Sequence, residues 1–416
     1  MNTSIFENIE SNVRSYCRNF PAVFTKAKGA IMTDENGKDY IDFFAGAGAL
    51  NYGHNPDAIN NKLIAYLQSN GIVHSMDMFT APKREFLEYF QANILAPRGM
   101  NYKIQFAGPT GTNAVEAAVK LARKVKGRQN IFAMMGAFHG MTMGALALTT
   151  DRCSREGAGQ ILPNVTHIPS PEMFPELDTV AYMERLITDD HSGVEKPAAI
   201  ILETVQADGG INVFEVEWLQ RLRQLCDRHD ILMICDDIQV GCGRTGNFFS
   251  FERANIIPDI VTISKSIGGC GMPLALVLFK PELDIWEPGQ HTGTFRGNQL
   301  ALIAGKAGLE TFIETNLGEE VKRKEAMVRQ FLARELPAID PKIAYRGLGL
   351  IWGIDFSAFE GDVTKPLIAA CFRKGLIIER VGRDNNVLKV MPPLMIEDEL
   401  LMQGLQIICD AIKEVI

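Results

Sequence analysis

The chain has 416 residues, of which 46% are hydrophobic and 22% are charged, and its formal net charge is −8. This length predicts two or three domains, and the composition excludes extended disorder, a collagen-like chain and a coiled coil. Because the balance of charge is acidic, there is no overall basic footprint for a nucleic acid.

The first segment and the cysteines indicate the compartment. Residues 1–21 carry several charged side chains and no apolar run, so they do not resemble a secretory signal. No stretch has about 18 consecutive apolar residues, so we predict no membrane span. The eight cysteines are scattered and form no C-x-x-C pair, which argues against a zinc or dithiol site. We therefore expect reduced thiols, a cytoplasmic location and no metal.

Residues 1–50 have the pattern of a small unit. Residues 31–33 and 40–44 flank the turn-like sequence Asp34-Glu35-Asn36-Gly37, which predicts a β-hairpin.

From about residue 100, short apolar runs alternate with amphipathic stretches. Residues 114–125 and 218–226 repeat apolar side chains at helical spacing, and Gly127 is a plausible helix stop. This alternation predicts an α/β domain with a mostly parallel sheet and a ligand site at the carboxyl ends of its strands. The predicted strands are 103–107, 131–134, 198–203, 231–236, 260–264 and 274–279.

The last quarter of the chain predicts a long helix from about 305 to 336, a mixed segment and a final helix over 397–414. We therefore expect a small domain built from both termini, with residues 1–50 as its N-terminal part and 306–416 as its C-terminal part. Residues 51–305 would form the large domain.

The glycines of Gly241-Cys242-Gly243-Arg244-Thr245-Gly246 match G-x-G-x-x-G after a predicted strand, and Asp259 follows. An NAD-dependent dehydrogenase is therefore an alternative. That interpretation needs a helix that opens at the glycines, whereas an aromatic segment follows them, which favours a connecting loop.

A second glycine-containing segment, Gly108-Pro109-Thr110-Gly111-Thr112-Asn113-Ala114, lies between a strand and a helix. Free N–H groups at a helix start bind phosphate, and hydroxyl groups add donors. The segment predicts a phosphate site made by Gly111, Thr112 and Asn113. The alternative is an ordinary helix cap by Thr112.

Two further features are an acid and a lysine at strand ends. Asp236 ends one predicted strand and Lys265 follows another. Each alone could be a solvated charge. A lysine whose neutral form is favoured is also an effective nucleophile.

The order of these features along the chain matches the needs of pyridoxal phosphate. The phosphate segment comes first, then Phe138-His139-Gly140, then Asp236 and Gln239, and finally Lys265. Asp236 would pair with the ring nitrogen, Phe138 would stack on the ring, Gln239 would reach the phenolic oxygen and Lys265 would bond to the aldehyde.

On these residues the chain resembles the class III (omega) aminotransferases of fold type I. The resemblance extends over nearly the whole chain and is carried by residues 111–117, 136–140, 203–206, 236–246, 264–265, 292–298, 346–350 and 391–394. It implies that Ile238 closes the second ring face, that Glu203 lies over the substrate pocket, and that Thr294 reaches the phosphate of a neighbouring subunit. A homodimer, or a dimer of dimers, is therefore expected.

Within the family, residues 1–18, 43–48, 105–111 and 295–298 resemble the branch that serves ectoine synthesis. This resemblance implies glutamate as the amino donor and aspartate 4-semialdehyde as the acceptor, with 2,4-diaminobutyrate and 2-oxoglutarate as products. After the donor amine displaces Lys265, the lysine would move the proton as base and acid.

Four positions depart from related patterns. Lys389 stands where many 4-aminobutyrate and ornithine enzymes have an arginine, and Met141 stands where 4-aminobutyrate enzymes have another. Ala207-Asp208 replaces the Gly-Glu expected of the ectoine enzyme. An ornithine-type or 4-aminobutyrate-type enzyme, or one supplying a siderophore or peptide antibiotic, therefore stays possible.

The family uses a Glu–Arg pair to hold or release a substrate carboxylate, and here we expect Glu203 and Lys389 in those roles. The alternative is that Lys389 is a surface lysine and Glu203 a fixed structural acid.

Overall fold

A computed structural model describes residues 3–158 and 163–416. Its largest sheet has seven strands in the order β4-β12-β11-β10-β7-β5-β6. All neighbouring pairs are parallel except those of β12, which runs antiparallel to β11 and β4. The strands are β4 (Lys103–Phe106), β5 (Ile131–Met134), β6 (Val165–Ile168), β7 (Ala199–Leu202), β10 (Leu232–Asp236), β11 (Ile260–Ile263) and β12 (Leu276–Phe279).

Six of these strands confirm the predictions from apolar runs, with ends shifted by up to two residues. The sequence prediction missed β6, an edge strand in which Thr166 and His167 break the apolar run.

Alternate residues of each strand face the two sides of this sheet. Ile131 and Ala133 belong to one apolar cluster, with helix α6 (Gly111–Lys126). Phe132 and Met134 belong to another, with helix α10 (Val216–Arg228). The sheet is thus covered on both faces, which explains its continuous apolar strands. Helix α6 ends at Gly127, whose φ of 61° confirms the predicted stop.

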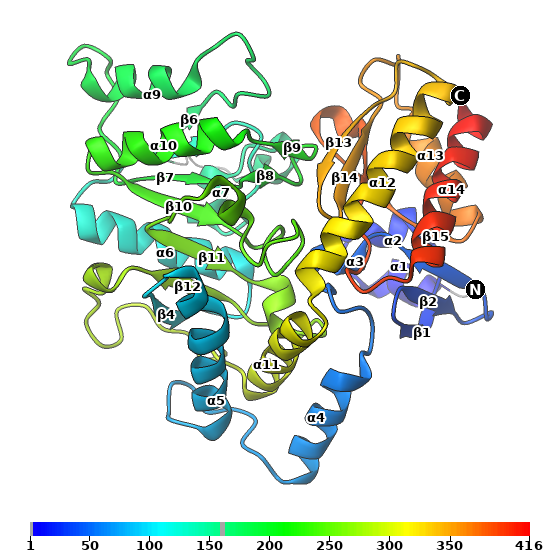
Figure 1. Cartoon of the computed structure of the whole chain (residues 1–416), viewed down its shortest axis with the longest axis horizontal. Helices are drawn as coiled ribbons and strands as arrows, with labels where there is room; N and C mark the ends of the chain where they lie inside the picture. Colours follow the sequence, from blue (N-terminus) through cyan, green and yellow to red (C-terminus); the bar gives the residue numbers. More distant parts are fainter. Residues whose placement is uncertain (1–2, 159–162) are drawn as a thin grey trace.

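Two smaller sheets lie in the other lobe of the molecule (Figure 1). One has the order β1-β2-β3-β15 and contains the predicted hairpin; the other has the order β13-β14-β17-β16. Both chain ends lie on this lobe (Figure 1). The strands are β1 (Phe24–Lys28), β2 (Ile31–Asp34), β3 (Asp39–Asp42), β13 (Ala344–Leu348), β14 (Ile351–Asp355), β15 (Leu376–Ile377), β16 (Glu379–Val381) and β17 (Val387–Val390).

The long helix predicted from 305 to 336 is two helices, so that prediction was wrong in its continuity. Helix α11 (Gln299–Glu314) ends before Asn316, and α12 (Leu317–Ile339) begins after it. Asn316 has φ 48°, a left-handed conformation that Asn adopts more readily than most residues. The predicted final helix is confirmed as α14 (Asp398–Val415).

The remaining α-helices and strands connect these layers. They are α1 (Ser4–Ile9), α2 (Tyr16–Asn19), α3 (Ala45–Gly48), α4 (Asp57–Gln68), α5 (Ala81–Phe90), α7 (Met143–Leu148), α8 (Arg152–Arg155), α9 (Thr179–Thr188), β8 (Val205–Gln206), β9 (Asn212–Val213) and α13 (Thr364–Arg373). Among the described residues, no helix combines the length and apolar character that crossing a bilayer requires.

Candidate active site

A cavity of about 240 Å³ lies at the carboxyl ends of the parallel strands. Nine of the predicted site residues line it, although they come from segments far apart in the sequence. The lining residues are Thr110, Gly111, Thr112, Phe138, His139, Gly140, Glu203, Asp208, Asp236, Ile238, Gln239, Val240 and Lys265. This placement follows the general rule for ligand sites in α/β sheets.

The predicted phosphate segment forms the first turn of α6, which begins at Gly111. The cap is Thr110 rather than Thr112, so the alternative of a Thr112 cap is wrong. The Asn113 side chain accepts a hydrogen bond from the Thr110 hydroxyl at 2.8 Å and does not line the cavity. A Cβ on Gly111 would lie 2.9 Å from Ile238 Cγ2, so any larger residue there would displace Ile238. Thr110, Gly111 and Thr112 line the cavity, so the N-terminus of α6 lies beside it.

The Thr112 hydroxyl is held by Thr142, which is held in turn by Glu116. It lies 2.6 Å from the Thr142 hydroxyl, which donates to Glu116 Oε1 at 2.6 Å. Glu116 also accepts from the N–H groups of Gly144 and Ala145. These contacts fix the position of one predicted phosphate donor.

Asp236 is a buried acid with three donors around it. Its Oδ2 lies 2.7 Å from His139 Nδ1, and its Oδ1 accepts from Thr262 Oγ1 and the Ile238 N–H, both at 3.1 Å. Burial lowers the pKa of His139, but the hydrogen bond and charge of Asp236 outweigh it, so the pKa lies above its ordinary value. The contact with Asp236 therefore favours the protonated form of His139.

Lys265 follows β11 and has φ 55°, which is unusual for a lysine. Sparsely populated backbone conformations cluster at functional sites. Among the described residues, the Lys265 amine makes no direct hydrogen bond or ion pair, and burial lowers its pKa. Burial therefore shifts Lys265 toward its neutral, nucleophilic form.

Glu203 is buried and bonded to the backbone. Its Oε1 accepts from the Phe138 N–H at 3.0 Å, and its Oε2 accepts from the Ala207 N–H at 3.3 Å. Burial raises the pKa of Glu203 to about 7, with the charge of Asp236 acting in the same direction and that of His139 against it. A proton can therefore be held here near neutral pH.

Lys389 is neither a surface lysine nor the partner of Glu203, so both of those predictions were wrong. It is buried, with 1% of its side chain exposed. Its Nζ lies 2.9 Å from Asp208 Oδ1, 2.7 Å from Glu379 Oε1 and 3.1 Å from Gln239 Oε1. Despite burial, the two carboxylates raise the pKa of Lys389 above its ordinary value, so it is cationic. Gln239 connects this cation to the cavity.

Sequence reasoning missed Asp208 and Glu379. Asp208 and Lys389 are each a departure from the expected pattern, and the structure shows that the two side chains bond to each other. Pairing the two departures would have found Asp208. Glu379 had no comparable signal, because its partner is set only by the pairing of β16 with β17.

The glycines at 241–246 do not open a helix; turns and then bends extend to Phe249. Arg244 is buried there and donates to the carbonyls of Leu350 and Pro392 and to Asn51 Oδ1. The segment is thus a connecting loop, and the dinucleotide site is contradicted by its local structure.

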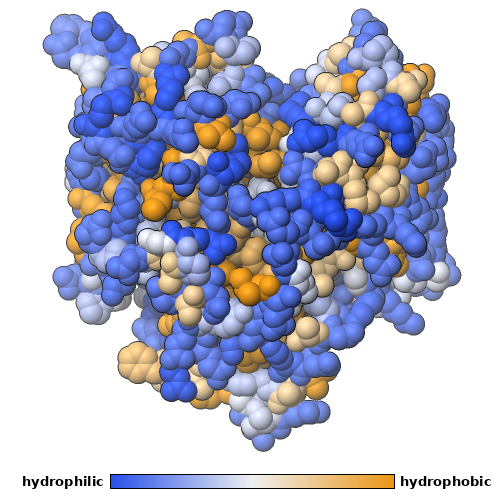
Figure 2. Space-filling model, viewed as in Figure 1, coloured by the Kyte–Doolittle hydropathy of each residue, from blue (hydrophilic) through white to orange (hydrophobic). Residues whose placement is uncertain are grey.

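Thr294 does not line the cavity of its own chain. Its carbonyl accepts from His74 Nε2 at 2.9 Å, and the neighbouring Phe295 ring packs on His74. The side chains of this region, including Phe79, are largely exposed. On the face of the molecule drawn in Figure 2, apolar residues lie exposed between polar ones over α4, α5 and α11.

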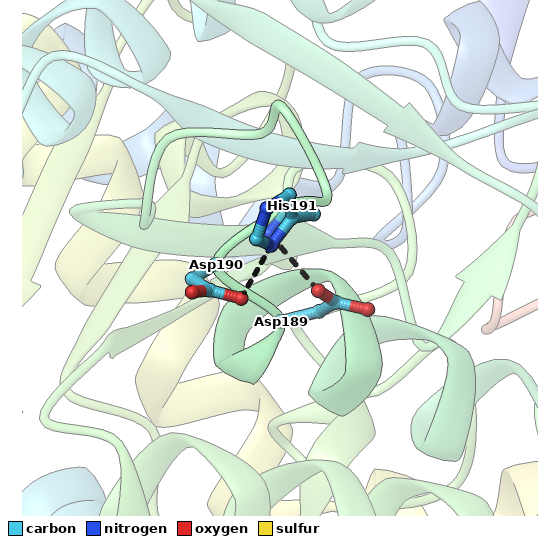
Figure 3. A group of neighbouring side chains, drawn as sticks. All are labelled: Asp189, Asp190 and His191. Carbon is cyan, nitrogen blue, oxygen red and sulfur yellow. Dashed lines mark hydrogen bonds and ion pairs between the residues drawn. The ribbon is translucent and has the colours of Figure 1, made fainter.

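One group of potential metal ligands occurs outside the cavity in the described ranges. Asp189, Asp190 and His191 lie at the end of α9, with His191 Nδ1 2.8 Å from Asp190 Oδ1 (Figure 3). Two of the three are exposed, and they contact one another rather than the cavity, so we assign them no role.

Comparisons of the sequence with known proteins all match one enzyme family. The family model described as aminotransferase class-III matches residues 13–412. A protein of Wolinella succinogenes named diaminobutyrate–2-oxoglutarate transaminase is 53% identical, covering 99% of this chain and 96% of its own length. One of Nocardia farcinica with the same name is 52% identical, covering 99% and 94%.

Solved structures show the same fold. An ornithine aminotransferase of Toxoplasma gondii, with partial occupancy of PLP at its active site, aligns with a TM-score of 0.86 at 26% identity, covering 99% of this chain and 94% of its own. An aminotransferase of Bacillus anthracis aligns with a TM-score of 0.89 at 25% identity, and the alignment covers both chains fully.

Proposed function

The chain belongs to the class III aminotransferases, and from that premise we propose that it transfers an amino group from L-glutamate to L-aspartate 4-semialdehyde. The products are 2-oxoglutarate and L-2,4-diaminobutyrate. The observation that carries this choice is the identity of about 50% over the whole chain to relatives named for that reaction.

Pyridoxal phosphate is the cofactor of such an enzyme, and it supplies an aldehyde and an electron-withdrawing ring. The cavity residues fit it. The α6 N-terminus with Gly111 and Thr112 suits the phosphate, whereas Asn113 does not line the cavity. Asp236 suits a protonated ring nitrogen, and Lys265 suits the aldehyde. His139 contacts Asp236 through Nδ1, and its buried Nε2 has no hydrogen-bond partner in the described chain.

Other residues complete the proposed cofactor site. Phe138 and Ile238 both line the cavity, and we assign them to the two faces of a flat ring; Gln239, also in the lining, would supply an amide for the phenolic oxygen. Lys265 is the group that holds and moves the proton, since its lowered pKa lets it act as base and then as acid.

Substrate carboxylates are recognised, in this proposal, by Lys389 with Asp208 as the acid that covers it. The contacts of Lys389 support Asp208, because Glu203 is engaged with two backbone N–H groups. Glu203 keeps a place over the substrate pocket, where its pKa of about 7 lets it carry a proton.

The proposed enzyme is a homodimer in which Thr294 serves the neighbouring subunit's phosphate. The exposed apolar residues around His74 and Phe295 support an interface there, since large apolar patches on a surface mark contact sites.

We also propose that residues 51–305 form the large domain and that the two flanking segments form the small one. A reducing, cytoplasmic setting is in line with the eight free cysteines.

A screen of the purified holoenzyme tests the function. Glutamate, ornithine, 4-aminobutyrate and diaminobutyrate are offered as donors against aspartate 4-semialdehyde, 2-oxoglutarate and pyruvate, and products are identified by mass spectrometry. We expect the glutamate and aspartate 4-semialdehyde pair to give the highest kcat/KM, with the Lys265→Ala variant as the blank. A clear preference for ornithine or 4-aminobutyrate would replace this proposal with the corresponding relative.

A further inference from the structure

Glu379 is placed opposite Lys389 by the pairing of two strands. In the antiparallel pair of β16 and β17, the residue across from Lys389 is Glu379, and their charged atoms lie 2.7 Å apart. On its other side Lys389 faces Gly353 of β14, which has no side chain. The sheet therefore holds one carboxylate permanently beside the lysine.

Asp208 is held differently. It comes from the turn between β8 and β9, it lines the cavity, and 36% of its side chain is exposed, against 10% for Glu379. When a substrate carboxylate arrives from the cavity, Asp208 is the partner that it can displace. Glu379 and Lys389 both lie behind the residues that line the cavity, so a carboxylate would reach Lys389 by displacing Asp208 while Glu379 stays in place.

The cluster has more negative than positive groups. Lys389 donates hydrogen bonds to Asp208 Oδ1 and Gln239 Oε1, and it forms an ion pair with Glu379 Oε1, which accepts no hydrogen bond among the described residues. Burial opposes ionisation of Asp208, but the charge of Lys389 outweighs it and the pKa of Asp208 is lowered. Burial raises the pKa of Glu379, and Lys389 opposes that rise. One cation therefore faces two acids.

We propose that Glu379 determines substrate specificity by acting as a fixed counter-charge to Lys389. Since Glu379 weakens the pull of Lys389 on a lone carboxylate, the cluster favours a substrate end that carries both charges. Lys389 then meets the carboxylate, and Asp208 meets the ammonium. This end is that of an α-amino acid whose distant amine reacts, such as diaminobutyrate, and not that of 4-aminobutyrate.

This inference rests on the proposed function for the identity of the substrate, but its charge component is tested with a ligand that does not react. Glutarate, a dicarboxylate, is titrated into the holoenzyme by calorimetry. In Glu379→Gln, we expect glutarate to bind roughly tenfold more tightly, because Lys389 has lost its fixed partner. The preference in kcat/KM for diaminobutyrate over 4-aminobutyrate should fall by about the same factor.

Matched variants separate charge from structure. Asp355→Asn removes a carboxylate from β14 of the same sheet, where it pairs with Arg346 at 2.6 Å, and should leave glutarate binding unchanged. Glu379→Asp keeps the charge and should stay within about twofold of the parent. Melting curves and the absorbance of the bound cofactor check that each variant is folded and loaded. Glu379→Met, of similar length, repeats the comparison without a polar group to bury.

Unchanged glutarate affinity in a folded Glu379→Gln or Glu379→Met variant overturns the inference, and so does an equal change in Asp355→Asn. If glutarate binds more tightly while the substrate screen selects another amine, the charge role of Glu379 stands and the proposed reaction falls. The two failures are therefore distinguishable.

Discussion

Lys265 is unusual among the lysines of this chain because it combines a left-handed backbone with an amine that has no hydrogen-bond acceptor among the described residues. We predict that borohydride reduction of the holoenzyme attaches a pyridoxyl group to the peptide that contains Lys265, as read by mass spectrometry. Lys389, paired with two carboxylates, is the internal control and should stay unmodified. A label on Lys389 would reverse the roles of the two lysines.

The two neighbouring acids Asp236 and Asp237 have different surroundings. Asp236 lines the cavity, whereas Asp237 accepts from the N–H and hydroxyl groups of Ser250 behind it. Asp236→Asn should reduce kcat by at least about 100-fold because a bound ring nitrogen loses its anion. Asp237→Asn should change kcat by less than about fivefold. Steady-state rates of both folded variants decide, and the opposite ranking would exchange the assignments.

Asp237 also gives a pH-dependent stability. Burial raises the pKa of Asp237 to about 7, with hydrogen bonds from Ser250 acting against the rise, so the folded state binds a proton that the unfolded state releases near pH 4. The stabilisation is complete below pH 4 and is lost as the pH rises through 7. Compared with Asp237→Asn, the parent should lose about 2–4 kcal/mol of unfolding free energy between pH 4 and 8. Denaturant titrations across this range measure it; parallel curves would contradict the buried acid.

At the residue scale, the positions of the reactive side chains could be predicted from the sequence, but the side chains that they contact could not. Lys265 and Asp236 follow apolar strands, and the resulting position at the strand ends depends only on the alternation of strands and helices. Lys389 was found because it stands three residues before Pro392-Pro393, where related enzymes have an arginine, but its partners come from a turn and from a neighbouring strand. Such contacts depend on register between segments distant in sequence, which a local pattern does not contain.

Among the elements, the loop after β10 is a connection between three parts of the chain. Arg244 in this loop bonds to the β13–β14 turn, to the segment after β17 and to Asn51. Arg244→Lys keeps the charge but loses the fork of donors, and we expect it to lower the unfolding free energy by about 2–4 kcal/mol. Arg185→Lys, at an exposed pair with Asp189, should change it by less than about 0.5 kcal/mol. Chemical denaturation compares the two, and equal small losses would show that the buried contacts contribute little.

The elements themselves followed from apolar periodicity where they were long and buried, as in α6 and α10. The break at Asn316 was missed because helical spacing continues on both sides of it, and a left-handed asparagine leaves no apolar signal. The two-residue strand β15 is too short to show a period at all.

For the whole molecule, the proposed sharing of Thr294 between subunits gives a mixing test. Lys265→Ala inactivates the cavity of its own chain, whereas Thr294→Glu should repel the phosphate in the partner's cavity. Each variant alone should be nearly inactive, but a mixed dimer contains one intact site. Random exchange after partial denaturation should therefore restore about a quarter of the parent activity. No recovery, with exchange verified by mass spectrometry, would place Thr294 outside the neighbouring site.

The parallel pairing of β15 with β3 constrains how the chain is made. Leu376 lies beside Ile41, so a strand formed early in synthesis waits for a partner about 330 residues later. At roughly 5–20 residues per second, that wait lasts roughly 20–70 s, during which the edge of β3 stays open on the ribosome. The nascent protein thus carries an unpaired strand edge for most of its synthesis, and any truncation before residue 376 leaves that edge permanently available to other chains.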